Sequence, residues 1–327
     1  MPEISRPVPS GALRLEAAAR TTMYFVGVHT QTSMIMRVFP RWAAALRLGD
    51  CRLAGIDLAL HDQVERYRQV VRFIKEDPRS IGALVTTHKI DLLHAAKDLF
   101  DELDELASLM GEVSSISKEG GRLKGSAKDP ITAGGALETF LPERHWERTR
   151  ADAFIIGAGG SSIALSWYLG HPDRGANRPA RILISNRSPA RLEEMRRVHA
   201  ACRMQVPVEY VLTPDPQDND SVIGRLAPGS LVANATGLGK DAPGSPVTDA
   251  AVFPRDGLAW DFNYRGNLVF LERARRQKES RRLHGEDGWV YFLIGWLAVI
   301  GQVFGRDIPL LGTGFDRLRR IAEAERR

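Results

Sequence analysis

Apolar and polar positions alternate along the chain with two periods, and each period predicts a different kind of element. Short apolar runs bounded by glycine or polar residues are typical of buried strands, whereas an apolar residue at every third or fourth position is typical of helices. Strands are expected at residues 23–27, 52–60, 81–86, 153–156, 181–186, 206–212, 231–235 and 258–262. Helices are expected at residues 40–48, 63–76, 89–110, 132–141, 161–170 and 289–304, and a hairpin at residues 113–116 and 122–125. This alternation predicts an α/β protein with a mostly parallel sheet in each half.

The composition is that of an ordinary globular protein, with 43% hydrophobic and 26% charged residues among 327. A chain of this length is long for one domain and sufficient for two. No apolar run reaches the roughly 18–20 residues that a membrane span needs. The N-terminus, a polar leader with several prolines over residues 1–20, lacks a secretory pattern. Cys51 and Cys202 have neither a paired nor a metal-binding spacing. We therefore expect a cytoplasmic protein with reduced thiols and no membrane partner.

The net charge of +5 is modest, and its densest contribution lies between Arg273 and Arg282. Glu272 and Glu279 break up this basic segment, and no aromatic residues interleave with it for base stacking. The pattern favours a solvated helix face over a nucleic-acid surface. The eight histidines show no metal-ligand spacing, so no metal site is predicted.

A glycine-rich turn, Gly157-Ala-Gly-Gly-Ser161, joins the apolar run at 153–156 to the next predicted helix. Gly157 permits a tight turn, and Gly159 lets the backbone approach a pyrophosphate without a Cβ in the way. Backbone N–H groups and the positive end of the helix would then face the phosphates. The third glycine of the dinucleotide fingerprint is absent, so the match is partial. A tight strand–helix turn without a ligand is the alternative.

The strand at 181–186 is expected beside this first strand, so its carboxyl end should lie over the adenosine ribose of a bound dinucleotide. A site for NAD would carry an acidic residue there, whereas this chain has Asn186, Arg187 and Ser188. Arg187 can pair with a 2′-phosphate through a charge-assisted contact, which predicts NADP as the cofactor. The alternative is an ordinary turn in which Ser188 caps the next helix.

Two charged residues in the first half follow predicted strands. Lys89 comes after the strand at 81–86 and begins a helix, and Asp129 ends the segment Gly125-Ser-Ala-Lys-Asp129. Strand ends that face a cleft between domains are where α/β proteins place their chemistry. Taken singly, a residue of this kind is more often an ordinary surface charge.

The order of these segments resembles the shikimate dehydrogenase family from about residue 24 to residue 305. The segments that carry the resemblance are Val85-Thr86 through Lys89, Gly111 to Ser115, Gly125 to Asp129, Gly157 to Ser161, Asn186 to Ser188, Asn234 to Gly239, and the aromatic helix after Gly288. The resemblance implies reversible hydride transfer between NADP and a secondary alcohol of a small carboxylated ring. It also implies a substrate-binding and catalytic domain over residues 1–131, completed by helices at 288–327. A Rossmann-type, doubly wound NADP domain would occupy residues 132–287.

By this resemblance Lys89 and Asp129 form the catalytic pair. The lysine would exchange a proton with the substrate oxygen, and the aspartate would fix the ammonium and bind a neighbouring hydroxyl. The implied substrate contacts are Thr30, Thr32, Ser33, Thr86 and Ser114. The implied cofactor contacts are Gly157, Ala158, Gly159, Gly160, Ser161, Asn186, Arg187, Ser188, Ala235, Thr236 and Gly237.

Several positions depart from the family pattern. The lysine motif is one residue short and lacks its proline, and Ser114 replaces an asparagine. Ala127 and Lys128 replace an asparagine and a threonine, so a cation stands beside the predicted catalytic carboxylate. Gly295 falls where the family has a glutamine, and the usual serine segment has become Thr30-Gln-Thr-Ser-Met34, which keeps hydroxyls able to bind a carboxylate. Because sites built to pair with hydroxyls discriminate through those pairings, a remodelled substrate pocket is predicted.

Two alternatives stay open. The chain could be an authentic shikimate dehydrogenase of aromatic amino-acid biosynthesis, or a non-catalytic NADP-binding regulatory protein. The presence of both Lys89 and Asp129 argues against the second. A related fold acting on folate or aminoacyl intermediates has no specific support. The sequence leaves open which carboxylated substrate is used, in which direction, and whether the chain forms a homodimer.

Overall fold

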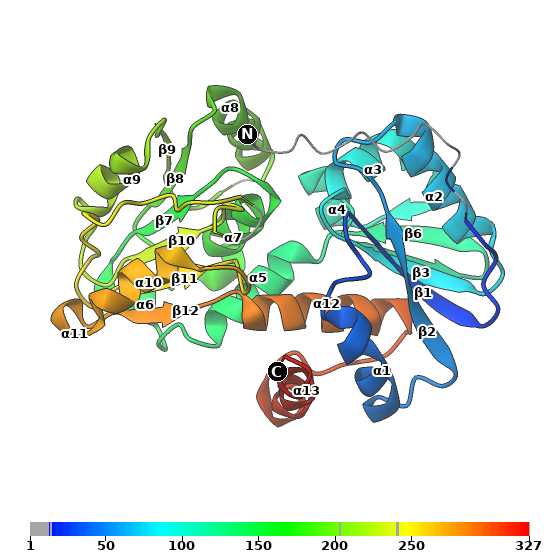
Figure 1. Cartoon of the computed structure of the whole chain (residues 1–327). Coiled ribbons are helices and arrows are strands. Elements are labelled where there is room, and N and C mark those ends of the chain that lie inside the picture. The colour runs from blue at the N-terminus through cyan, green and yellow to red at the C-terminus, as the bar shows by residue number, and fades with distance from the viewer. Residues whose placement is uncertain (1–12, 14, 203, 240–241, 327) are drawn as a thin grey trace, which may run out of the picture. The chain divides into compact units, whose positions relative to one another are not determined.

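The computed structural model describes residues 13, 15–202, 204–239 and 242–326, and the chain divides into two compact units (Figure 1). Unit 1 comprises Met1–Lys128 and Trp296–Arg327, and unit 2 comprises Asp129–Gly295. Most of the predicted leader, residues 1–12 and 14, lies outside the described residues. The chain leaves unit 1 after Lys128 rather than after residue 131, and returns after Gly295 rather than after residue 287. The boundary after Gly295 falls inside one continuous helix, α12 (Trp289–Val303), so no loop in the sequence marks the point where the chain returns to unit 1.

Unit 1 is built on a six-stranded sheet in the order β2-β1-β3-β5-β6-β4 (Figure 1). The strands are β1 (Thr21–Gly27), β2 (Cys51–Asp57), β3 (Ser80–Val85), β4 (Glu102–Leu103), β5 (Ser115–Glu119) and β6 (Arg122–Ser126). β1 pairs in parallel with β2 and β3, and β4 with β6, whereas β5 runs antiparallel to β3 and β6. The predicted strands and hairpin are confirmed, and the antiparallel hairpin makes this sheet a mixed one.

The helices of unit 1 correct two predictions. They are α1 (Ile35–Ala45), α2 (Val64–Glu76), α3 (Lys89–Ala96), the 3₁₀ turn η1 (Lys97–Leu99), α4 (Glu105–Met110), the second half of α12, and α13 (Gly312–Ala324). α1 begins before the predicted residue 40 and contains Pro40. The single helix predicted at 89–110 is interrupted, because β4 joins the sheet beside β6 and the Asp104 carboxylate caps α4 by accepting from Ala107 N at 2.7 Å.

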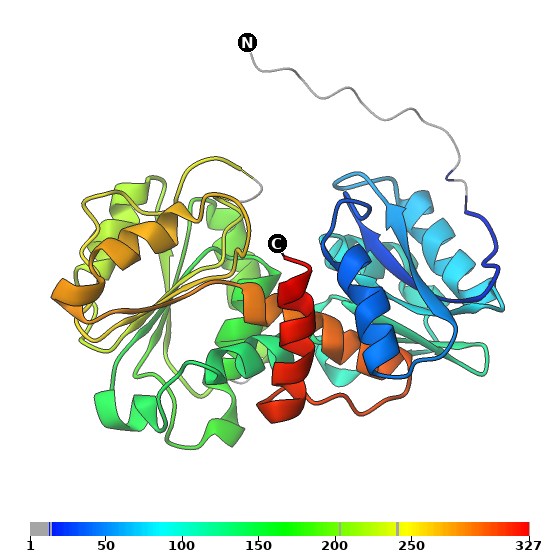
Figure 2. The same ribbon diagram turned by 60° about the horizontal axis from the view of Figure 1, so that its bottom comes forward.

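The C-terminal helix α13 packs on α1 (Figure 2). The buried indole of Trp42 donates to the carbonyl of Leu318 at 2.9 Å and joins the two helices. The main core of the unit lies between the sheet and α2 and α3, where fully buried side chains such as Val26, Val70, Ile74 and Ile116 gather. Burial of such apolar surface is the main stabilising contribution and fixes the orientation of the sheet against its helices.

Unit 2 is built on a fully parallel sheet in the order β12-β11-β10-β7-β8-β9. Its strands are β7 (Ala153–Ile156), β8 (Ile182–Asn186), β9 (Val208–Leu212), β10 (Leu231–Asn234), β11 (Leu258–Asp261) and β12 (His284–Glu286). The order runs outward from β7 in both directions, so the predicted doubly wound, Rossmann-type fold is confirmed. The switch point of such a sheet, here between β7 and β10, is where this architecture binds ligands.

Helices alternate with the strands of unit 2, and the helices predicted at 132–141 and 161–170 correspond to α5 (Asp129–Glu138) and α7 (Gly160–Gly170). The helices of unit 2 are α5 (Asp129–Glu138), α6 (His145–Thr149), α7 (Gly160–Gly170), the 3₁₀ turn η2 (Pro172–Arg174), α8 (Pro189–Ala201), α9 (Pro216–Ile223), α10 (Val269–Arg276), α11 (Lys278–Arg281) and the first half of α12. The predicted basic helix at 273–282 is therefore two short helices. Within the described residues, every helix is too short or too polar to cross a membrane.

α5 and α7 approach each other closely at Gly134. A Cβ at this position would lie 2.2 Å from the ring of Tyr168. That ring cannot move easily, because its hydroxyl donates to Glu138 at 3.0 Å and the Arg174 guanidinium lies over it at 4.5 Å. At the next residue, Gly135, a Cβ would meet Ile294 at an ordinary 3.7 Å.

We therefore expect Gly134→Ala to lower the free energy of unfolding by about 1–3 kcal/mol, as overpacking does. Gly135→Ala is the matched control and should be neutral or stabilising by up to about 1 kcal/mol, because alanine favours the helix. Denaturant unfolding of both variants measures the difference. Equal stability of Gly134→Ala and the wild-type chain would contradict the close packing.

Candidate functional site

The glycine turn lies between β7 and α7, at the switch point of unit 2. Gly157 has a φ of +115°, and a Cβ there would lie 2.9 Å from the carbonyl oxygen of Ala235. Its N–H donates to Ser185 O at 2.8 Å, which joins the turn to β8. Gly159 precedes α7 in extended conformation, and no described heavy atom outside its immediate chain neighbours lies within 4 Å of a Cβ built there. The turn therefore leaves an open approach to its backbone beside the helix N-terminus formed by Gly160 and Ser161, with Ala158 between the two glycines.

The end of β8 carries the predicted Asn186–Ser188 segment beside β7, as expected. Asn186 Oδ1 accepts from the N–H of Ser188 at 2.8 Å, and Ser188 Oγ accepts from Arg191 N at 3.4 Å and caps α8. The alternative role of Ser188 as a cap is thus correct. The cap formed by Ser188 does not involve the Arg187 side chain. That side chain is exposed and forms no hydrogen bond or ion pair within the described part of the chain.

The predicted residues Ala235, Thr236 and Gly237 follow β10 at the same sheet edge. Ala235 N donates to Ile156 O at 2.9 Å, next to the glycine turn. The Asn234 side chain folds this loop, because its Oδ1 accepts from Thr236 N at 3.0 Å and from Thr236 Oγ1 at 2.6 Å. The Thr236 hydroxyl is therefore engaged within the loop itself.

Two residues that the sequence analysis missed hold this loop from β11. Asp261 Oδ1 accepts from Asn234 Nδ2 and from Asn263 N, each at 3.0 Å. Asn263 Nδ2 donates to the carbonyls of Thr236 and Leu238, each at 3.1 Å. The Asp261 side chain is buried, and burial raises its pKa to about 6. Asp261 and Asn263 could have been identified as candidates from their position at the carboxyl end of the predicted strand 258–262.

A buried hydrogen-bond chain joins the helices that start at the two predicted cofactor segments. Ser166 Oγ of α7 lies 2.8 Å from His199 Nε2 of α8, and His199 Nδ1 lies 2.8 Å from the Tyr210 hydroxyl of β9. Burial lowers the pKa of His199 to about 4. The imidazole is therefore neutral in the folded protein at pH 7 and fixes α7 against α8 without a charge.

In unit 1, the predicted residues Thr86, Lys89 and Ser114 meet at one edge of the sheet. Lys89 begins α3, and its N–H donates to Thr86 O at 3.1 Å. Its carbonyl accepts from Val113 N at 3.2 Å, and the carbonyl of Ser114 accepts from Val85 N at 2.9 Å. The carboxyl end of β3 and the start of β5 are thus joined, and Lys89 is half-buried between the buried His88 and the exposed Ile90.

The segment with Thr30, Thr32 and Ser33 follows β1 at the same edge. Thr30 is fully buried, and both its N–H and its hydroxyl donate to Asp57 Oδ1, at 2.8 and 2.6 Å. Its hydroxyl proton is therefore directed at Asp57. The sequence analysis missed Asp57, which lies inside the strand predicted at 52–60 and is the last residue of β2. Thr32 is exposed and its hydroxyl donates to His29 O at 3.3 Å, whereas Ser33 is half-buried.

Asp129 is the first residue of α5 and belongs to unit 2, whereas Lys89 belongs to unit 1. The Asp129 side chain is buried, and its carbonyl accepts from Thr132 Oγ1 at 3.2 Å. It directly follows Lys128, whose N–H donates to Ser114 Oγ at 2.8 Å. The pairing of Lys89 with Asp129 stays a prediction.

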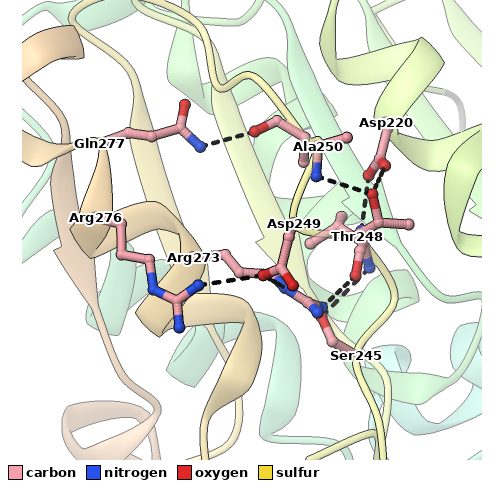
Figure 3. Close-up of polar contacts among 10 residues, drawn as sticks. Asp220, Ser245, Thr248, Asp249, Ala250, Arg273, Arg276 and Gln277 are labelled. Atoms are coloured by element: carbon pink, nitrogen blue, oxygen red, sulfur yellow. Dashed lines mark hydrogen bonds and ion pairs between the residues drawn. The ribbon is translucent and has the colours of Figure 1, made fainter.

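The basic segment of α10 and α11 is partly paired with acidic residues (Figure 3). Arg273 and Arg276 both contact Asp249 Oδ1, at 2.9 and 3.2 Å, and Arg282 forms two bonds of 2.6 Å with Asp256. Gln277 donates to Ala251 O at 2.7 Å. These contacts anchor the loop before β11. Within the described residues, no three His, Cys, Asp or Glu side chains gather as metal ligands would.

The neutral state of His199 predicts a pH dependence of stability. Its pKa is about 4 in the folded chain and about 6.5 when unfolded, so the unfolded state binds more protons between these values. Stability should therefore fall as the pH drops from about 6.5 towards 4, by roughly 3 kcal/mol over the whole window. Urea unfolding at a series of pH values measures this dependence. The free energy of unfolding of His199→Gln should change less between pH 6.5 and pH 4 than that of the wild-type chain. His94→Gln, which removes an exposed histidine, should keep the pH dependence of the wild-type chain. The same pH dependence in the wild-type chain and both variants would contradict the neutral state of His199.

Comparison with known proteins adds to these observations. No family model matches the chain. It is 30% identical over 201 residues to the shikimate dehydrogenase (NADP(+)) of Symbiobacterium thermophilum, which covers 61% of this chain and 64% of that protein. The chain spans less than two thirds of the length of the curated relatives that it matches most strongly.

Solved structures share the fold over nearly the whole chain. A quinate dehydrogenase from Corynebacterium glutamicum in complex with NAD aligns with a TM-score of 0.72 at 18% identity, over 93% of this chain and 99% of that one. A shikimate dehydrogenase from Aquifex aeolicus aligns with a TM-score of 0.70 at 18% identity, over 96% of this chain and 100% of that one. The predicted resemblance is confirmed: the chain is similar in sequence to shikimate dehydrogenases and has the two-domain fold of shikimate and quinate dehydrogenases.

Proposed function

We propose that the chain is an NADP-dependent oxidoreductase that acts on the CH–OH group of a small carboxylated substrate, or on the corresponding ketone. The observation that carries the proposal is the open glycine turn at the switch point of unit 2. Arg187, which directly follows β8, has no hydrogen bond or ion pair among the described residues. The sequence similarity to shikimate dehydrogenases whose names specify NADP(+) supports the cofactor. Two free cysteines, Cys51 and Cys202, accord with a cytoplasmic location.

The residues of unit 2 fit a dinucleotide phosphate. Gly159 leaves its backbone open, and the α7 N-terminus offers N–H groups to a pyrophosphate. Asn186, Arg187 and Ser188 place a cation and neutral groups where a 2′-phosphate would lie, with no carboxylate among them. Ala235, Thr236 and Gly237 would border the cofactor from the neighbouring strand. When bound, NADP supplies the acceptor and donor of hydride.

The residues of unit 1 would bind the substrate and move its proton. Lys89, at the carboxyl end of β3, would take the proton of the alcohol or return it to the alkoxide in the reverse direction. Asp129 would hold the ammonium, and Thr32, Ser33, Thr86 and Ser114 would contact the substrate. Because Ser114 already accepts from Lys128 and Thr30 already donates to Asp57, fewer hydroxyl groups are available for a polyhydroxylated ring.

The smaller number of available hydroxyl groups favours a carboxylated alcohol or ketone related to shikimate over shikimate itself as the substrate. An authentic shikimate dehydrogenase is the second candidate, favoured by the names of the relatives in the sequence comparison. A spectrophotometric assay with shikimate and NADP separates the two candidates. A regulatory protein without catalysis is disfavoured, because Lys89 lies half-buried at the carboxyl end of a strand and beside Ser114.

The proposal predicts that Lys89 is required for turnover. A screen of hydroxy and keto acids, followed at the nicotinamide absorbance, identifies the active substrate class. On that substrate, Lys89→Met should lower kcat by about 10²–10⁴-fold, the usual contribution of a general acid–base, while NADP still binds. Lys97→Met, at an exposed position beyond α3, is the control and should retain turnover. Wild-type turnover by the Lys89 variant would reject its role.

The preference for NADP over NAD should depend on Arg187. A charge-assisted contact to the 2′-phosphate is worth about 1.5–3 kcal/mol, so Arg187→Ala should reduce the ratio of NADPH to NADH affinity by about 10- to 100-fold. The control is Arg191→Ala, because Arg191 is already paired with Glu194 at 2.8 Å. Fluorescence titration of both cofactors measures the ratios. If the wild-type chain holds NADH as tightly as NADPH, the cofactor assignment is wrong.

A further inference from the structure

Lys128 lies at the same sheet edge as Lys89, and β5 separates the strands β3 and β6 that precede the two lysines. It follows β6, and its N–H donates to Ser114 Oγ at 2.8 Å. The preceding residue of that segment, Val113, donates to the carbonyl of Lys89 at 3.2 Å. Two hydrogen bonds through Val113 and Ser114 therefore connect the main chains of the two lysines, and both lie within unit 1.

Lys128 is half-buried. Within the described part of the chain, its ammonium forms no hydrogen bond and no ion pair. Burial lowers its pKa, while Asp104 attracts the charge and Lys124 repels it. The Asp104 carboxylate makes no ion pair with this ammonium among the described residues, and its Oδ1 accepts from Ala107 N at 2.7 Å and from Ala127 N at 3.3 Å. A cation held partly out of water without a partner is unfavourable, and an anion that binds it offsets this cost.

We propose that Lys128 determines substrate specificity by binding a second carboxylate, so that the substrate is a dicarboxylic hydroxy or keto acid. This inference rests on the proposed function, because it takes the Lys89 edge of unit 1 as the substrate site. A charge-assisted bond from the ammonium to a carboxylate is about twice as strong as one between neutral groups, so a hydroxyl at this place would be the poorer partner.

A carboxylate suits this position better than a phosphate. Phosphate sites combine several donors or cations, whereas the cation nearest along the strand, Lys124, is already paired with Glu102 at 2.5 Å. Lys128 thus offers a single ammonium. Its partly buried position also places it where a bound ligand, rather than bulk solvent, would complete its hydrogen bonds.

Two ligands that cannot be oxidised test this proposal without turnover. Cyclohexanecarboxylate and cis-cyclohexane-1,3-dicarboxylate differ by one carboxylate, and calorimetric titration into the full chain with NADP present gives the ratio of their affinities. We expect the wild-type chain to bind the dicarboxylate about 10- to 100-fold more tightly. Lys128→Met should abolish that preference, and Lys128→Arg should restore most of it.

Lys124→Met is the matched control, because it removes the same charge from the strand that Lys128 follows, at a position already paired with Glu102. It should keep the preference of the wild-type chain. An unchanged preference in Lys128→Met, or no preference in the wild-type chain, overturns the inference. Loss of the preference in both Lys128→Met and Lys124→Met would show a general effect of charge and would also overturn the inference. In each of these cases, turnover that depends on Lys89 would leave the proposed function standing.

Discussion

The close approach of Gly157 to the main chain of Ala235 is the constraint on which the candidate cofactor site depends. Only a residue without a Cβ fits there, because of the positive φ and the 2.9 Å distance to a carbonyl oxygen. This contact brings the turn after β7 against the loop after β10. Parallel pairing then places the end of β8 at the same edge, so three segments separated by tens of residues face one location.

The equivalent constraint in unit 1 is a ladder of main-chain bonds across β3, β5 and β6. Val85 donates to Ser114 O at 2.9 Å, and Ser114 donates to Ser126 O at 3.0 Å. Because β5 runs antiparallel to both neighbours, its first residues lie where β3 and β6 end. The hairpin therefore brings Lys128 to the edge that carries Lys89, which a purely parallel sheet would do only through a long crossover.

The sequence predicted those elements whose signal is local. The glycine turn, the strands beside it, the cap at Ser188 and the start of α3 at Lys89 all depend on residues within a few positions of one another. The split of the helix expected at 89–110 depends on the pairing of β4 with β6, which no periodicity within 89–110 reveals. The use of the Thr30 hydroxyl by Asp57 likewise arises between neighbouring strands, so a motif comparison along the chain could not show it.

Charge is distributed in a way that separates structural from ligand-binding roles. Two groups that hold the candidate cofactor site are buried, and burial disfavours the charged form of each. It lowers the pKa of His199 to about 4, so the imidazole is uncharged at neutral pH, and it raises the pKa of Asp261 to about 6. Cations with a structural role, such as Arg273 and Arg282, are paired with carboxylates. Arg187 and Lys128 lack such partners within the described residues, and each stands at a strand end. In the proposals made above, each of these two cations acts through the anion that it binds and not through an ion pair within the fold.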